Sequence, residues 1–267
     1  LTNAPPTFSD PWKESLNKEF DGVPDNGGPV KPTYDGRPIF HTRDVDKTRF
    51  SPASENLDPT LSRAAALATV PLGVRRLLRF IDVLDIFTAP WAPEQFLENE
   101  GILKQLIATH LKLIVGKNEW KKHKSRLFAI LDTDIELARK QHIVWITNRQ
   151  QGKTSTLSKF LAVMAYLSPT GGSLIYVYST SRDRAQELID ASRKYLWWAR
   201  TTPEIADKLA TYGLEVPQFK SNNASGFRMQ SATNSVAVNL IKARPKSVES
   251  CRGDAPHSAF IDEIAFV

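Results

Sequence analysis

The stretch HIVWITNRQQGKTSTLSKFLAVMAYL, residues 142–167, carries the strongest fold signal in the chain. Its short apolar run at 142–147 predicts a buried strand, and the run at 155–168 predicts a helix. The loop between them ends in the triplet Gly-Lys-Thr. A strand, a loop with this ending and a helix are the context that a phosphate-binding loop requires.

This loop departs from the usual pattern GxxxxGK[ST], because Thr147 stands where the first glycine belongs. Backbone N–H groups at a helix N-terminus still point toward an anion, with the positive end of the helix dipole behind them. Lys153 would reach the β- and γ-phosphates of a nucleotide, and the Thr154 hydroxyl would ligate Mg²⁺. The residues assigned to nucleotide binding are Asn148, Arg149, Gln150, Gln151, Gly152, Lys153 and Thr154.

A second candidate element lies far downstream, where the apolar stretch 257–262 predicts a strand that ends in two carboxylates. Asp262 would hold the metal, and Glu263 would polarise the attacking water. Ligands of open α/β sheets lie outside the carboxyl ends of the strands, so both elements would meet at one edge. Taken alone, two neighbouring acids after an apolar run also fit a plain surface turn.

The sequence around these elements predicts an α/β fold. Its pattern predicts a second buried strand at 173–180, an amphipathic helix with a serine cap at 181–199, and a hairpin of 226–232 with 235–243. Short apolar runs that alternate with helical ones are typical of a parallel sheet covered on both faces. We therefore expect a P-loop nucleotide-hydrolase core over 141–267, with a mainly parallel central sheet flanked by helices.

Two regions precede this core. Nine of the 17 prolines fall in the first 60 residues, so we expect an extended, proline-rich arm over 1–69. Over 70–140 we expect a helical subdomain. Its apolar residues recur every three or four positions at 70–87 and 93–116, and a third helix is predicted at 125–140.

Composition limits the possible classes. A chain of 267 residues with 41% hydrophobic and 24% charged residues fits one globular core plus an appendage. The single cysteine, Cys251, cannot form an internal disulfide, which favours a reducing compartment. No apolar run approaches the roughly 18–20 residues of a membrane span, so no membrane contact is expected.

Positive charge is concentrated in residues 101–126, which hold seven Lys or Arg against one Glu. Such a cluster either binds a phosphate backbone or forms a solvated helix face. Trp197 and Trp198 either stack on bases or seal a core or subunit contact. The five histidines lack the spacing of metal ligands, so ordinary core or surface roles are expected.

The run Arg149-Gln150-Gln151-Gly152-Lys153-Thr154 resembles the variant phosphate-binding loop of viral genome-packaging terminase large subunits. These commonly read Arg-Gln-x-Gly-Lys-Ser/Thr without the first glycine. The same family continues with a strand and long helix, a polar hairpin, an Arg-Gly pair similar to Arg252-Gly253, and an apolar strand that ends in Asp-Glu. The resemblance covers residues 140–267.

The resemblance implies an ATP-hydrolysing motor that translocates double-stranded DNA into a procapsid, with ATP and Mg²⁺ as cofactors. It implies Mg²⁺ ligation by Thr154 and Asp262 and a catalytic carboxylate at Glu263. Arg149 would sense or neutralise the γ-phosphate, with a surface arginine as the alternative. Arg252 would enter a neighbouring subunit's site, with a loop arginine that binds DNA or nothing as the alternative.

The implied partners are double-stranded DNA, a portal protein, a small terminase subunit and further copies of the chain in a ring. The implied location is the procapsid portal of an infected cell, in the cytoplasm for a tailed phage or the nucleus for a herpes-like virus. The family's nuclease domain is expected after residue 267, and its adenine-recognising glutamine has no good match here. A helicase-like translocase and a non-hydrolysing nucleotide-binding scaffold at the portal are the alternative functions.

Overall fold

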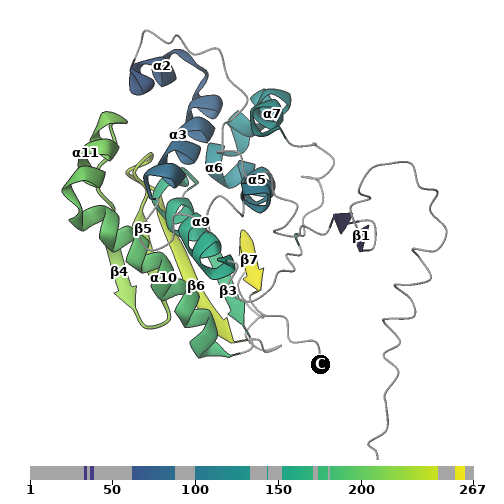
Figure 1. Ribbon diagram of the computed structural model, residues 1–267, viewed down its shortest axis with the longest axis vertical. Helices are drawn as coiled ribbons and strands as arrows, with labels where there is room; N and C mark the ends of the chain where they lie inside the picture. Colours follow the sequence, from purple (N-terminus) through teal and green to yellow (C-terminus); the bar gives the residue numbers. More distant parts are fainter. Residues whose placement is uncertain are drawn as a thin grey trace, which may run out of the picture. The chain divides into compact units, whose positions relative to one another are not determined.

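The computed structural model describes residues 33–34, 37–38, 62–87, 100–132, 143, 152–170, 174–179, 181–245 and 256–261. The chain divides into two units, Leu1–Pro38 and Ile39–Val267. In the first unit, β1 (Thr33–Tyr34) and β2 (Arg37–Pro38) pair as antiparallel strands. All other described elements belong to the second unit, and Figure 1 shows them with their labels.

A layer of helices opens the second unit. Its members are α2 (Arg63–Thr69), α3 (Leu72–Ile86), α5 (Glu100–Thr109), α6 (Leu111–Val115) and α7 (Lys117–Leu131). The helix predicted at 70–87 is thus confirmed, while α2 lies inside the segment for which an extended arm was expected. The third helix begins at Lys117 rather than at residue 125. The prediction missed its first turns because their basic sequence lacks apolar periodicity.

In the described part of the chain the main sheet has five strands, in the order β4-β5-β6-β3-β7. Their bounds are β3 (Leu174–Ser179), β4 (Phe219–Asn223), β5 (Gly226–Gln230), β6 (Val238–Pro245) and β7 (Ser258–Ile261). β3 pairs in parallel with β6 and β7, whereas β4, β5 and β6 form antiparallel pairs. The sheet is therefore mixed, which corrects the prediction of a mainly parallel sheet. The predicted hairpin of β5 and β6 is confirmed, and β4 extends it at the edge.

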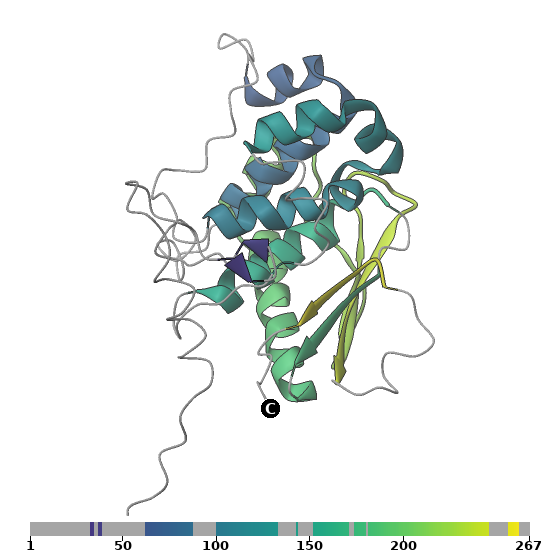
Figure 2. The ribbon, with the colours of Figure 1, turned by 90° about the vertical axis from the view of Figure 1, so that its right-hand side faces the viewer.

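Helices α9 (Lys153–Leu167) and α10 (Arg182–Thr201) both pack against the sheet, and α11 (Pro203–Thr211) follows α10. The predicted serine cap is confirmed, since the Ser181 side chain accepts a hydrogen bond from Arg184 N at 3.2 Å. Ile175 and Val177 of β3 join the core with the helices, so the alternating Tyr176 and Tyr178 face the other way. Within the described residues the helices lie on one face of the sheet (Figure 2).

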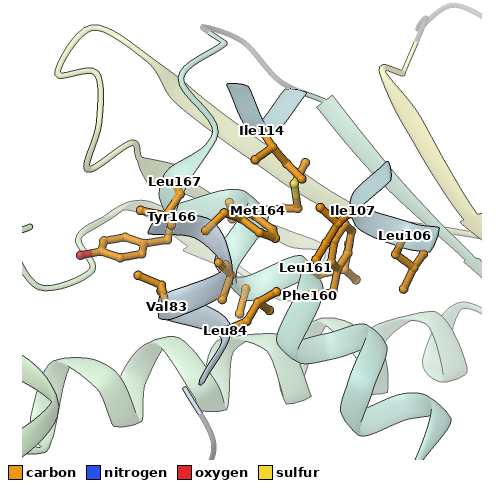
Figure 3. Packing of buried hydrophobic residues seen from close by; sticks show 14 of the residues in the cluster. Val83, Leu84, Leu106, Ile107, Ile114, Phe160, Leu161, Met164, Tyr166 and Leu167 are labelled. Carbon is orange, nitrogen blue, oxygen red and sulfur yellow. The ribbon is translucent and has the colours of Figure 1, made fainter. Parts of the chain in front are cut away.

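Helix α9 is the centre of the core. Every residue from Thr156 to Leu167 is buried, which is typical of a helix enclosed on all sides. Figure 3 shows α9 side chains, among them Phe160 and Met164, packed against residues of α3, α5 and α6. The helical layer and the sheet thus share one hydrophobic core, with α9 between them.

Candidate functional site

The predicted phosphate-binding triplet forms the start of α9. Gly152 is the N-cap residue and adopts a left-handed conformation, φ 72° and ψ 15°, which glycine reaches without steric cost. Lys153 is the first helical residue, two positions before the predicted start at 155. No side-chain cap hydrogen bond forms at Gly152 among the described residues, and the N-terminus of a helix is a place where an anion is stabilised. Lys153 is half-buried and Thr154 is exposed.

Hydrogen bonds at the other end of α9 fix its direction relative to the sheet. Asn239, near the amino end of β6, donates from Nδ2 to Ala165 O at 2.9 Å and to Ser168 O at 3.0 Å. The last turn of α9 therefore lies beside the amino end of β6. Since α9 is about 21 Å long, its first residue, Lys153, lies toward the carboxyl ends of the parallel strands β3, β6 and β7.

Strand β7 leads to the same edge. It runs parallel to β3, with Tyr178 opposite Ile261, the last residue of β7. The carboxylates Asp262 and Glu263 follow Ile261 directly in the sequence. The described ends of the two candidate elements, the start of α9 and the end of β7, thus point to one edge of the sheet.

Much of the predicted site lies outside the described residues. The residues concerned are Asn148, Arg149, Gln150, Gln151, Arg252, Asp262 and Glu263. The roles assigned to them stay predictions. In the described part of the chain, no group of three or more His, Cys, Asp or Glu residues could hold a metal ion.

A buried histidine, His110, joins three parts of the fold. It lies between α5 and α6, its Nδ1 is 2.7 Å from Leu106 O, and its Nε2 is 2.6 Å from Ser258 Oγ on β7. A carbonyl can only accept, so Nδ1 carries the proton and Nε2 accepts from the Ser258 hydroxyl. The imidazole also stacks on Phe260, at 5.3 Å between ring centroids, and meets the edge of Phe160 on α9 at 5.4 Å.

His110 thereby connects the helical layer to the candidate phosphate-binding helix and to the strand that precedes the acid pair. Burial lowers the pKa of His110 from 6.5 to about 4, so the imidazole is neutral at pH 7. The expectation of an ordinary core histidine holds for this residue. Its partner Ser258 is 148 residues away in the sequence, so no local pattern pointed to the contact.

The structure also buries a lysine that was not among the candidate residues predicted from the sequence. Lys159 lies in the middle of α9 with 2% of its surface exposed. Burial lowers its pKa from 10.5 to about 7, and the nearby carboxylate of Asp85 on α3 opposes the shift. The only sequence signal for this residue was a single charge inside an otherwise apolar helix.

Lys159 is expected to make stability depend on pH above neutrality. Between its native pKa of about 7 and its unfolded value of 10.5, the unfolded chain binds more protons, so the free energy of unfolding rises with pH. From pH 7 to pH 9 this gain is about 2 kcal/mol. In Lys159→Met the gain should disappear, as urea unfolding of both proteins at the two pH values would measure. An equal gain in both proteins would contradict the assignment.

The two neighbouring tryptophans have different environments. Trp198 is half-buried and packs against the hydrophobic core, as expected for a residue that seals a core. Trp197 is 61% exposed on the outer side of α10. The core contact therefore accounts for Trp198. For the exposed Trp197, stacking on bases and sealing a subunit contact both stay open.

The described residues define an α/β protein with a mixed five-stranded sheet flanked by helices. The chain matches no family model, no curated protein and no solved structure. None of the described helices is long and apolar enough to span a membrane.

Proposed function

We propose that this chain is the ATP-hydrolysing motor domain of a terminase large subunit, with a P-loop fold, that translocates double-stranded DNA into a viral procapsid. One observation supports the proposal most strongly. Helix α9 begins at Lys153, directly after a left-handed glycine, and it does so toward the sheet edge where β7 ends. Open α/β sheets bind their ligands at this edge.

The residues present at this edge fit a magnesium-bound triphosphate. The first turn of α9, which no side chain caps in the described part of the chain, presents N–H groups of the kind that bind phosphate, and the exposed Thr154 offers a hydroxyl ligand. Two buried hydroxyls, Thr156 in the first turns of α9 and Ser179 at the carboxyl end of β3, have no hydrogen-bond partner among the described residues. Buried polar atoms without partners in a fold are uncommon, so these two hydroxyls support the proposal that a polar ligand binds at this edge.

In the proposed reaction, water attacks the γ-phosphate in line and ADP leaves. The amine of Lys153 and the guanidinium of Arg149 would offset the charge that develops on the phosphoryl oxygens. Thr154 and Asp262 would hold Mg²⁺, whose charge neutralises the β- and γ-phosphates. Glu263 would orient the attacking water and accept its proton. Grip on DNA would be mainly with phosphates, and therefore sensitive to salt and blind to sequence.

Binding of magnesium-ATP tests the proposal directly. In Lys153→Ala, the loss of the phosphate-binding ammonium is expected to weaken ATP binding at least tenfold, or about 1.4 kcal/mol. Titration calorimetry on the chain would measure the change. Lys208→Ala, an exposed lysine on α11, provides the matched control and should bind ATP as the wild type does. Equal affinity in Lys153→Ala and the control would remove the nucleotide site.

Hydrolysis separates a motor from a scaffold that only binds nucleotide. DNA-stimulated ATPase activity should fall to background in Glu263→Gln while ATP binding persists, because the variant lacks the base that activates water. A wild-type chain that binds ATP, but does not hydrolyse it with DNA present, would instead support the scaffold.

A further inference from the structure

On α6 and α7 the cations of the basic segment lie at exposed and half-exposed positions. From residue 112 to residue 126 the chain holds six lysines and arginines and a single acid, Glu119. The six cations are all exposed or half-exposed. We call these six residues the basic face; its members are Lys112, Lys117, Lys121, Lys122, Lys124 and Arg126.

The single acid of this segment is turned toward the protein. Glu119 is 14% exposed, and its Oε2 accepts a hydrogen bond from Gly73 N at 3.0 Å, in the first turn of α3. Its Oε1 is 3.5 Å from the Lys122 ammonium, and its Oε2 is 3.8 Å from His123 Nε2. The carboxylate thus accepts a hydrogen bond at the N-terminus of α3, where a negative charge is stabilised. Apart from Glu119, which pairs with Lys122, the side chains from residue 112 to residue 126 that carry a formal charge at pH 7 are all cationic.

Trp120 holds part of the basic face in place. The ammonium of Lys112 lies 4.6 Å from the centre of its ring, and that of Lys124 lies 5.3 Å from it. The ring itself packs against the hydrophobic core. Cation–π contacts of this kind restrict two flexible side chains, so less entropy is lost when they bind an anion.

The basic face is separate from the candidate nucleotide site. The Ser168 hydroxyl, just after α9, donates to Leu113 O of α6 at 2.9 Å. Helix α6 therefore lies beside the last turn of α9, at the end opposite to Lys153. Figures 1 and 2 agree, since α7 lies at the far end of the unit from the arrowheads of β3 and β7.

The residues around the basic face indicate which kind of polyanion it would bind. The exposed large apolar residues of the described chain are Leu72, Trp197, Val236 and Ile261, none of them on α6 or α7. The face therefore lacks the apolar side that inserts into a lipid surface. Two lysines lie over the Trp120 ring, so the face also lacks the free aromatic platform that single strands use.

We propose that the basic face binds the phosphate backbone of duplex nucleic acid without reading its bases. A duplex presents one negative charge per about 1.7 Å of its axis, and lysines and arginines release its counterions. Contacts to phosphates position a protein on a duplex and carry no sequence information. This inference does not depend on the nucleotide site.

Fluorescence anisotropy with a labelled, mixed-sequence duplex of about 30 base pairs, at 50 and 200 mM salt, tests the proposal. The variant combines Lys117→Gln, Lys121→Gln and Lys122→Gln. Its affinity should fall about 30-fold, and the slope of log K against log salt should become shallower by about 2.7, because three phosphate contacts are lost. Circular dichroism would confirm that the variant is folded.

The matched control combines Arg200→Gln, Lys208→Gln and Lys220→Gln, three exposed cations on α10, α11 and β4. It changes the net charge equally, so its affinity should stay within about threefold of wild type. An equal loss in both variants would overturn the proposal in favour of net charge alone. Loss of binding to phosphatidylserine vesicles in the first variant, with duplex binding intact, would overturn it in favour of a membrane surface.

Two further measurements keep this inference distinct from the proposed motor function. ATP binding should be unchanged in the variant with three substitutions on α7, and duplex binding should be unchanged in Lys153→Ala. A loss of duplex binding in Lys153→Ala comparable to that of the α7 variant would overturn the assignment of the duplex site to α6 and α7.

Discussion

Gly226→Ala is expected to lower the free energy of unfolding by about 3 kcal/mol, because the hairpin of β5 and β6 leaves no room for a side chain. A Cβ atom at this position would lie 2.3 Å from Ile241 O and 3.0 Å from Lys242 Cα. Both neighbours are backbone atoms, so no rotation of a side chain relieves the overlap. The two strands would have to separate where Gly226 pairs with Lys242.

The same position is held from the other side by α10. Arg193 donates from Nη2 to Gly226 O at 2.8 Å and to Asn223 O, and its guanidinium lies over the Phe227 ring. A shift of β5 away from β6 would disturb these contacts as well. The strain therefore cannot be relieved by moving β5 alone, which is why we expect a loss at the upper end of the range for overpacked sites.

Urea unfolding at pH 7, followed by circular dichroism, would measure the loss, with Gly213→Ala as the control. Gly213 has a positive φ, 67°, but no atom lies within 4 Å of the position that a Cβ atom would take there. Alanine at this position meets only backbone strain, which amounts to about 1 kcal/mol. A destabilisation by Gly226→Ala no larger than that of Gly213→Ala would contradict the close approach of the strands.

Lowering the pH from 7 to 4 is expected to remove about 3 kcal/mol of stability through His110 alone. Its pKa is about 4 in the folded chain and 6.5 in the unfolded chain. Between these values the unfolded state binds more protons, so the free energy of unfolding falls as the pH falls through this window. The described groups around the imidazole are the Leu106 carbonyl, the Ser258 hydroxyl and the rings of Phe160 and Phe260, and none of them carries a charge.

The expected loss of stability in acid arises at the contact between His110 and β7. Protonation at Nε2 would replace the acceptor of the Ser258 hydroxyl with a second donor and leave a positive charge in the core. We therefore expect the contacts between the helical layer and β7, the strand that precedes the acid pair, to weaken in mild acid.

Comparison with His110→Leu isolates this effect. Urea unfolding at several pH values from 7 to 4 would measure the free energy of unfolding of both proteins. Between pH 7 and pH 4 this free energy should fall by about 3 kcal/mol more in the wild type than in His110→Leu. His257→Gln, which replaces an exposed histidine near β7, should retain the decline of the wild type. Identical pH profiles for wild type and His110→Leu would show that His110 is not the buried neutral group described here.

Part of the candidate site could be predicted from the sequence because its signals are local. A glycine before a helix, a serine cap and the alternation of a hairpin each involve residues a few positions apart. Ser181 accordingly occupies its predicted place as the cap of α10. Gly152 directly precedes α9, although this helix begins at Lys153, two positions before its predicted start. The acid pair and the arginines at 149 and 252 lie outside the described residues and stay predictions.

The sequence by itself determined the α/β class, the presence of a helix directly after the Gly-Lys-Thr triplet region, and the hairpin of β5 and β6. Only the tertiary structure decided the strand order, the mixed pairing, and the burial of Lys159 and His110. The reason is physical: periodicity and capping depend on neighbours along the chain, whereas burial and strand pairing depend on which distant segments meet. The bond from His110 to Ser258 has no trace in either local sequence, because each residue acquires its partner only when β7 packs against α5 and α6.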